Sequence, residues 1–153
     1  MPIAAEDLLG TWSLVTWDIQ YSDQRPVTYP YGADAQGMLI YAPDQHLSVV
    51  ICSAGRPRLT TEAVRKAPVE QKVGAFETYF SYAGRWELRD DAIVHRLSYA
   101  LNPNFIGTDQ VRQLQLEGDR LTLSTTDEVK GVSRLHRLVW KRTGTPSRIR
   151  LSL

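Results

Sequence analysis

The chain has 153 residues and a formal net charge of +1. This length suits one domain with a core that needs no disulfide, and the single cysteine, Cys52, has no partner within the chain. The balanced charge provides no general attraction for nucleic acid or an anionic membrane, and no apolar run is long enough to span a bilayer. With no signal-peptide pattern, we expect a cytoplasmic protein with one domain, residues 1–142, and a C-terminal tail, residues 143–153.

Three strands are predicted in the first third of the chain. A helical turn ends before Gly10, and segments rich in β-branched and aromatic residues follow at residues 11–21, 37–42 and 46–53. Prolines, glycines and short polar residues separate these segments, as is typical of loops and turns. The alternation of apolar and polar residues gives most strands one buried and one wet face.

Helical signals then interrupt the strands. Thr60 or Thr61 can cap a short helix, and Pro68 suits the first turn of a second one. Apolar residues of the second helix recur at spacings of four, three and four, which predicts one stripe that packs across a hydrophobic surface. The stripe consists of Val69, Val73, Phe76 and Phe80.

Five more strands are predicted in the second half of the chain. They occupy residues 82–88, 92–101, 107–118, 120–126 and 133–142. Eight strands joined mostly by short turns favour an all-β fold, either an antiparallel up-and-down barrel or a sandwich, with a helical insert between strands three and four. We expect the barrel, because closure removes exposed edges and an eight-stranded barrel can hold one small ligand.

Several segments resemble the bacterial and fungal lipocalin-like domain family. Gly10, Thr11 and Trp12 form a Gly-X-Trp start, and segments such as NPNFIGTDQVRQLQLEGDRLTLST and RLVWKR follow in the order of that family. The resemblance covers about Leu8 to Arg142 and implies a lipocalin-like (calycin-type) barrel. It implies little about function, since barrels of this shape include binders of hydrophobic ligands and a few enzymes, and some family members lie near genes for small-molecule (secondary) metabolism. It carries over no catalytic residues.

Strand parity places four polar side chains inside the predicted barrel. His95 and Tyr99 share the lining parity of residues 92–101, while Gln110 and Arg112 begin the lining parity of the next strand. The loop between these strands is short, so we expect the strands to be neighbours and their polar groups to share one cavity. A few fixed polar groups among apolar walls are typical of a small-molecule site.

Arg112 is the central candidate, because a buried guanidinium needs a partner and the lining positions of the later strands include no carboxylate. Its partner could be water, a carbonyl, a carboxylate such as Asp18 or Glu77, or an anionic ligand that uses the guanidinium fork. A purely architectural role at the strand ends is the alternative. The full predicted ligand-binding set is Arg112, Gln110, Tyr99, His95, Trp86, Leu97, Leu114, Trp140 and Tyr79.

Three functions would use this barrel differently. A binding protein would hold a small hydrophobic or amphipathic molecule with an anionic or polar end. In a cofactor-free isomerase or cyclase, Arg112 would stabilise an enolate while His95 or Tyr99 moves a proton. The third is an inert scaffold or dimer module with a filled barrel, and a homodimer stays open. We expect no metal and no cofactor, since the three histidines lack metal-ligand spacing and no nucleotide-binding motif is present.

Overall fold

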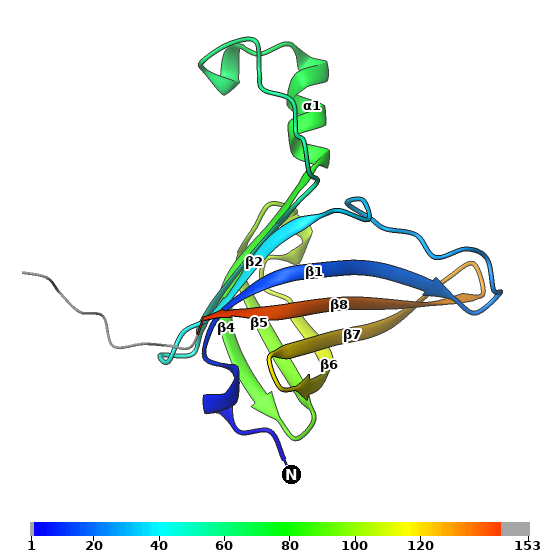
Figure 1. Ribbon diagram of the computed structural model, residues 1–153. Helices are drawn as coiled ribbons and strands as arrows, with labels where there is room; N and C mark the ends of the chain where they lie inside the picture. The colour runs from blue at the N-terminus through cyan, green and yellow to red at the C-terminus, as the bar shows by residue number, and fades with distance from the viewer. Residues whose placement is uncertain (1, 145–153) are drawn as a thin grey trace, which may run out of the picture.

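The computed structural model describes residues 2–144, which form a closed barrel of eight antiparallel strands (Figure 1). Each strand pairs with the next along the chain, and the first strand pairs with the last. The expected barrel is confirmed, and the sandwich is not observed. The strands are β1 Gly10–Tyr21, β2 Gln36–Tyr41, β3 His46–Cys52, β4 Tyr79–Arg89, β5 Ala92–Ala100, β6 Asp109–Glu117, β7 Arg120–Val129 and β8 Val132–Gly144.

Helical segments are few and short. The one α-helix is α1, Val69–Glu77, within the part of the chain that is described. Three 3₁₀ turns accompany it: η1 Ala5–Leu8, η2 Val64–Lys66 and η3 Pro103–Phe105. None of these helices is long and apolar enough to cross a membrane. β8 continues to Gly144, past the expected domain end, and the rest of the predicted tail, residues 145–153, lies outside the described residues.

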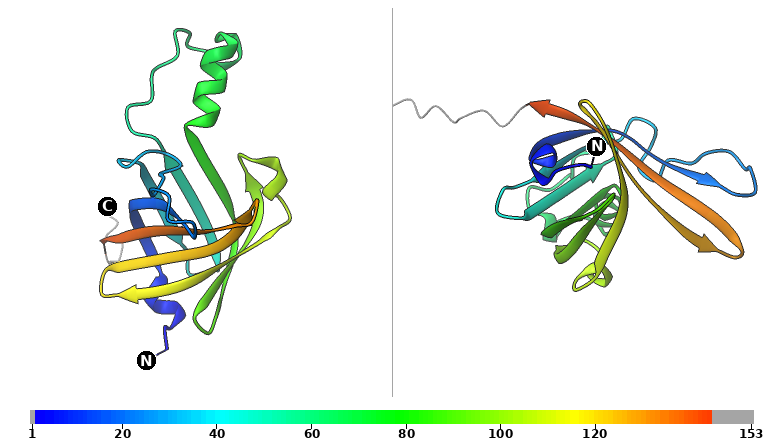
Figure 2. Two further views of the ribbon diagram at one scale, coloured as in Figure 1. Left: turned by 90° about the vertical axis from the view of Figure 1, so that its right-hand side faces the viewer. Right: turned by 90° about the horizontal axis from the view of Figure 1, so that it is seen from below.

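Tryptophans fill the end of the barrel that carries η1. The Trp12 indole is fully buried, donates a hydrogen bond to the Leu8 carbonyl oxygen at 3.0 Å, and lies beneath the Arg142 guanidinium at 4.2 Å. Trp86 donates to the carbonyl oxygen of Ala42 at 3.2 Å, in the turn after β2. Figures 1 and 2 show η1 and α1 at opposite ends of the barrel, so the packed end is the one far from the helical insert.

The helical insert lies between β3 and β4 as expected, but its apolar stripe does not pack on the barrel. α1 projects away from the strands (Figures 1 and 2), and Val69 and Phe76 are 72% and 52% exposed. The predicted packing of the stripe is therefore wrong. Phe80 belongs to β4 and pairs with Ile51 of β3, because the aromatic run that begins at Tyr79 favours a strand over a fourth helical turn.

A β-bulge in β5 changes which side chains face inward. Gly84 of β4 pairs with Leu97, whereas the preceding Ala83 pairs with Tyr99, so Ser98 is an extra residue. The extra residue reverses the alternation beyond it. Tyr99 consequently points outward and is 74% exposed, which corrects its predicted place inside the barrel.

Candidate functional site

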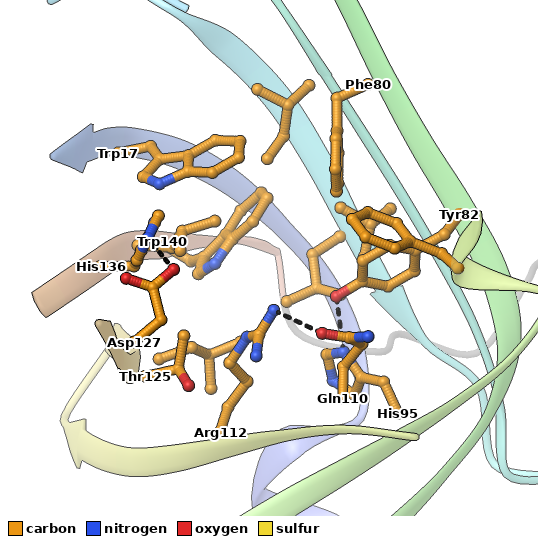
Figure 3. A pocket seen from close by; sticks show the side chains of 16 residues that line it. Trp17, Phe80, Tyr82, His95, Gln110, Arg112, Thr125, Asp127, His136 and Trp140 are labelled. Atoms are coloured by element: carbon orange, nitrogen blue, oxygen red, sulfur yellow. Dashed lines mark hydrogen bonds and ion pairs between the residues drawn. The ribbon is translucent and has the colours of Figure 1, made fainter. Parts of the chain in front are cut away.

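A cavity of about 310 Å³ lies inside the barrel, and its lining includes Ile51 and Phe80, near the ends of the two strands that the helical insert joins (Figure 3). Every strand contributes at least one lining residue. The volume is at the lower end of the roughly 300–1,000 Å³ that is usual for small-molecule pockets. The interior is therefore not packed solid, which goes against the filled scaffold.

Aromatic rings form much of the wall around the mouth. The Trp17 ring centroid lies 5.3 Å from that of Tyr31 and 5.5 Å from that of Phe80. Phe80 in turn lies 5.5 Å from Tyr82 and 6.1 Å from Phe105, in edge-to-face geometry. These arrangements hold rings at fixed angles, and they leave flat apolar surfaces against which a planar ligand can pack.

Deeper in the cavity, His95 is held between two tyrosines. Its Nε2 atom lies 2.7 Å from the Tyr41 hydroxyl oxygen, and its Nδ1 atom lies 2.7 Å from the Tyr82 hydroxyl oxygen. Burial, reinforced by the charge of Arg112, lowers the pKa of His95 to about 3, and burial raises the pKa of Tyr82 to about 12. The three rings are therefore neutral at pH 7.

This neutral triad has one hydroxyl hydrogen more than it can use internally. A neutral imidazole donates through one nitrogen and accepts through the other, so one tyrosine donates to His95 while the other accepts from it. Of the two tyrosines, Tyr82 lines the cavity and Tyr41 does not. An acceptor placed in the cavity would thus favour the Nδ1–H tautomer of His95, which donates to the Tyr82 oxygen. The Tyr82 hydroxyl would then donate its own hydrogen bond to that acceptor.

Arg112 of β6 points into the same cavity without a carboxylate partner. Its Nη2 atom donates to the Gln110 side-chain oxygen at 3.3 Å and its Nη1 atom to the Val111 carbonyl oxygen at 3.3 Å, both long for such bonds. Within residues 2–144 no carboxylate lies within ion-pair distance of it. Asp18, one of the expected partners, pairs with Arg137 at 3.2 Å instead. The guanidinium therefore keeps donors available for a ligand.

The carboxylate that lines the cavity, Asp127, is already engaged. Arg134 donates to its two oxygens at 2.8 and 2.7 Å, and the His136 Nε2 atom lies 3.3 Å from one of them. The hydrogen bond from Arg134 lowers the pKa of Asp127, and burial lowers the pKa of His136. With Asp127 compensated by Arg134, the positive charge of Arg112 is the one left unbalanced inside the cavity.

The comparisons with known proteins agree with this architecture. Residues 9–143 match the family model described as the lipocalin-like domain. The chain belongs to the lipocalin-like domain family. It is also 26% identical over 106 residues to the 4'-hydroxy-3'-methoxypropiophenone carrier protein ppsC of Aspergillus oryzae, a match that covers 63% of this chain and 96% of that relative.

Several predicted residues line the cavity of this lipocalin-like barrel, and others pack in its core. The lining ones are Arg112, Gln110, His95 and Trp140, whose contacts with a ligand stay predictions. Leu97 and Leu114 are buried in the core outside the cavity wall. Trp86 packs on Tyr41 with ring centroids 5.1 Å apart and likewise contributes no wall.

Two further predicted site residues, Tyr99 and Tyr79, also lie outside the lipocalin-like cavity. The bulge at Ser98 turns Tyr99 outward, so Tyr99 does not share the cavity with His95 and Arg112 as predicted. Tyr79 lies in surface grooves near the mouth, where the Arg56 guanidinium sits 5.2 Å from its ring. Of the predicted catalytic residues, His95 and Arg112 alone share the cavity.

Sequence reasoning missed two features of the lining. Trp12 and Trp17 have opposite parity, yet both face inward, because Val15 is an extra residue of β1 between Leu14 and Thr16. Tyr82 has the lining parity, but its contact with His95 depends on the register between β4 and β5. Neither feature could be read from the local sequence. A bulge adds one residue to a strand and can form with many residue types, so no particular residue marks its position.

Acid should destabilise the barrel through His95. Its pKa is about 3 in the folded state against 6.5 for an ordinary histidine, so between these values the unfolded chain binds a proton that the folded chain does not. Stability should therefore fall as the pH drops from about 6.5 towards 3, by up to about 1.4 kcal/mol per unit for this group. Urea unfolding at a series of pH values measures the slope. The variant Y41F/H95L/Y82F should show a shallower slope, and equal slopes would contradict the assignment to His95.

Proposed function

We propose that this protein binds and carries a small, largely apolar molecule whose anionic or polar end contacts Arg112. The observation that supports this most is the Arg112 guanidinium, which faces an aromatic cavity with no carboxylate partner in residues 2–144. A ligand oxygen would supply the missing charge-assisted hydrogen bonds. The carrier role in the name of the Aspergillus relative supports transport over turnover. The free thiol of Cys52 suits a reducing compartment, so we place the carrier in the cytoplasm.

Catalysis by proton transfer has less support in this cavity. A general base works best with a pKa near the working pH, whereas burial lowers the pKa of His95 to about 3. Both ring nitrogens of His95 are also occupied by tyrosine hydroxyls. The residue is thus better suited to orient Tyr82 towards a bound oxygen than to take a proton from a substrate.

Arg112→Leu tests the proposal directly. We expect this change to weaken binding of 2-naphthoate by more than about 1.5 kcal/mol, roughly tenfold, because a charged hydrogen bond is lost. The neutral compound 2-isopropenylnaphthalene has the same shape as the acid and no oxygen, so its affinity should barely change. Dissociation constants come from fluorescence titration of the two ligands.

Arg85→Leu is the matched control, because Arg85 is an exposed arginine of β4 that lies outside the cavity lining. It should leave both affinities unchanged. Equal losses for acid and hydrocarbon in the Arg112 variant, or an equal loss of acid binding in the Arg85 variant, would remove Arg112 as the anchor. If the unmodified protein bound neither compound, that result would count against the carrier function.

A further inference from the structure

The four tryptophans of this chain form two pairs, which differ in whether the indole N–H group has a hydrogen-bond acceptor. Trp12 and Trp86 each donate to a backbone carbonyl oxygen, at 3.0 and 3.2 Å. The indole nitrogens of Trp17 and Trp140 are buried and have no hydrogen-bond partner within residues 2–144. A buried donor without an acceptor is costly, so native structures rarely leave one unmet unless it serves another purpose.

The unmet pair lines the cavity that holds Arg112. Trp17 comes from β1 and Trp140 from the neighbouring β8, and Trp140 is only 1% exposed. Figure 3 shows both rings on one wall, with their nitrogen-bearing edges on the side where Arg112 and Asp127 lie. The side chains that carry the two unmet donors and the charged anchor therefore line the same cavity.

Most polar groups left free in this cavity are donors, while the Thr125 hydroxyl can donate or accept and the His136 Nδ1 atom can accept. Trp17, Trp140 and Arg112 offer N–H groups, and the tyrosine–histidine triad offers one hydroxyl hydrogen at Tyr82. The lining carboxylate of Asp127 already accepts from its own neighbours. A ligand that brings further donors, above all an ammonium group, would leave these N–H and O–H groups without acceptors. An ammonium group would also be repelled by the positive charge of Arg112.

Building on the proposed carrier function, we propose that the ligand is an oxygenated aromatic compound that accepts hydrogen bonds at two separate points. Its charged or polar end binds Arg112, and a second oxygen, such as a ketone, accepts from the indole N–H groups of Trp17 and Trp140. The aromatic rings on the cavity wall hold the planar part between these points. Acceptor oxygens at both points separate this class from fatty acids, which carry one polar end.

Two probes of matched shape test the second contact. The compounds 6-acetyl-2-naphthoate and 6-isopropenyl-2-naphthoate share the carboxylate and the ring, but a methylene group replaces the ketone oxygen in the second. We expect the acetyl compound to bind roughly three- to tenfold more tightly, the range of one neutral hydrogen bond. In ¹H–¹⁵N spectra its binding should move the indole proton signals of Trp17 and Trp140 downfield, while Trp12 and Trp86 serve as internal controls.

Trp140→Phe removes one N–H group and keeps an aromatic ring. It should reduce the preference for the acetyl compound over the isopropenyl compound, whatever loss of affinity the smaller ring causes for both. Trp86→Phe, outside the cavity, should leave the preference intact. If Trp140→Phe does not fold, the indole signals of the unmodified protein decide. Equal affinities with unmoved Trp17 and Trp140 signals would overturn the second contact while the carrier function stands, whereas failure of both naphthoates to bind would overturn the carrier function itself.

Discussion

Replacing Gly84 with alanine should destabilise the barrel by about 4 kcal/mol or more, which is at the upper end for a single substitution. A Cβ atom at this position would lie 1.8 Å from the carbonyl oxygen of Arg96 and 3.1 Å from the Cα atom of Leu97. Both are backbone atoms of β5, next to the bulge at Ser98, so no side-chain rotation can relieve the clash. Urea unfolding followed by circular dichroism measures the loss.

Gly74→Ala provides the control, because Gly74 lies in α1 and a Cβ there would meet nothing within 4 Å. Alanine favours a helix over glycine by up to about 1 kcal/mol, so this variant should be neutral or slightly stabilised. If Gly84→Ala unfolded at the same urea concentration as the unmodified protein, β4 and β5 could not approach each other as closely as described here.

Replacing His95 with leucine should cost about 2–6 kcal/mol of folding free energy. The change leaves the hydroxyl groups of Tyr41 and Tyr82 buried without their common partner, and each unmet hydroxyl costs about 1–3 kcal/mol. Thermal and urea unfolding would show the loss as a lower transition midpoint.

Adding Tyr41→Phe and Tyr82→Phe to the leucine variant should restore most of that stability. The triple variant has apolar rings in place of the whole network, and removing both partners of a buried hydrogen bond is far less harmful than removing one. If the triple variant remained as unstable as His95→Leu alone, the shape of the imidazole, and not its two hydrogen bonds, would be what the core requires.

The barrel could be predicted from the sequence because its signals are local. Alternating polarity and short turns define each strand, and their number favours closure. Departures from regular alternation could not be predicted. The bulge at Val15 in β1 brings Trp17 to the same interior as Trp12, and the bulge at Ser98 sends Tyr99 outside. Such a one-residue shift reverses the parity of everything beyond it.

The candidate site could likewise be predicted where its strands are regular. Gln110 and Arg112 lie in a regular part of β6, and His95 precedes the bulge in β5, so their predicted inward positions hold. The register pairs His95 directly with Gln110, a relation that the loop length alone does not fix. The stripe of α1 illustrates another limit. Its period identifies an apolar face, but no periodicity says what covers that face.

The pairing of β1 with β8 has a consequence for how this chain folds. The hydroxyl of Thr143 donates to the carbonyl oxygen of Thr11, 132 positions away, and Trp12 pairs with Arg142 along the same seam. The turns of the intervening meander can form early, whereas this seam must wait until nearly the whole chain is synthesised, and its closure carries the largest loop entropy. We therefore expect the seam to close last. Until it does, two unpaired edges are exposed to other nascent chains, which makes speed of synthesis and chaperone access relevant to yield.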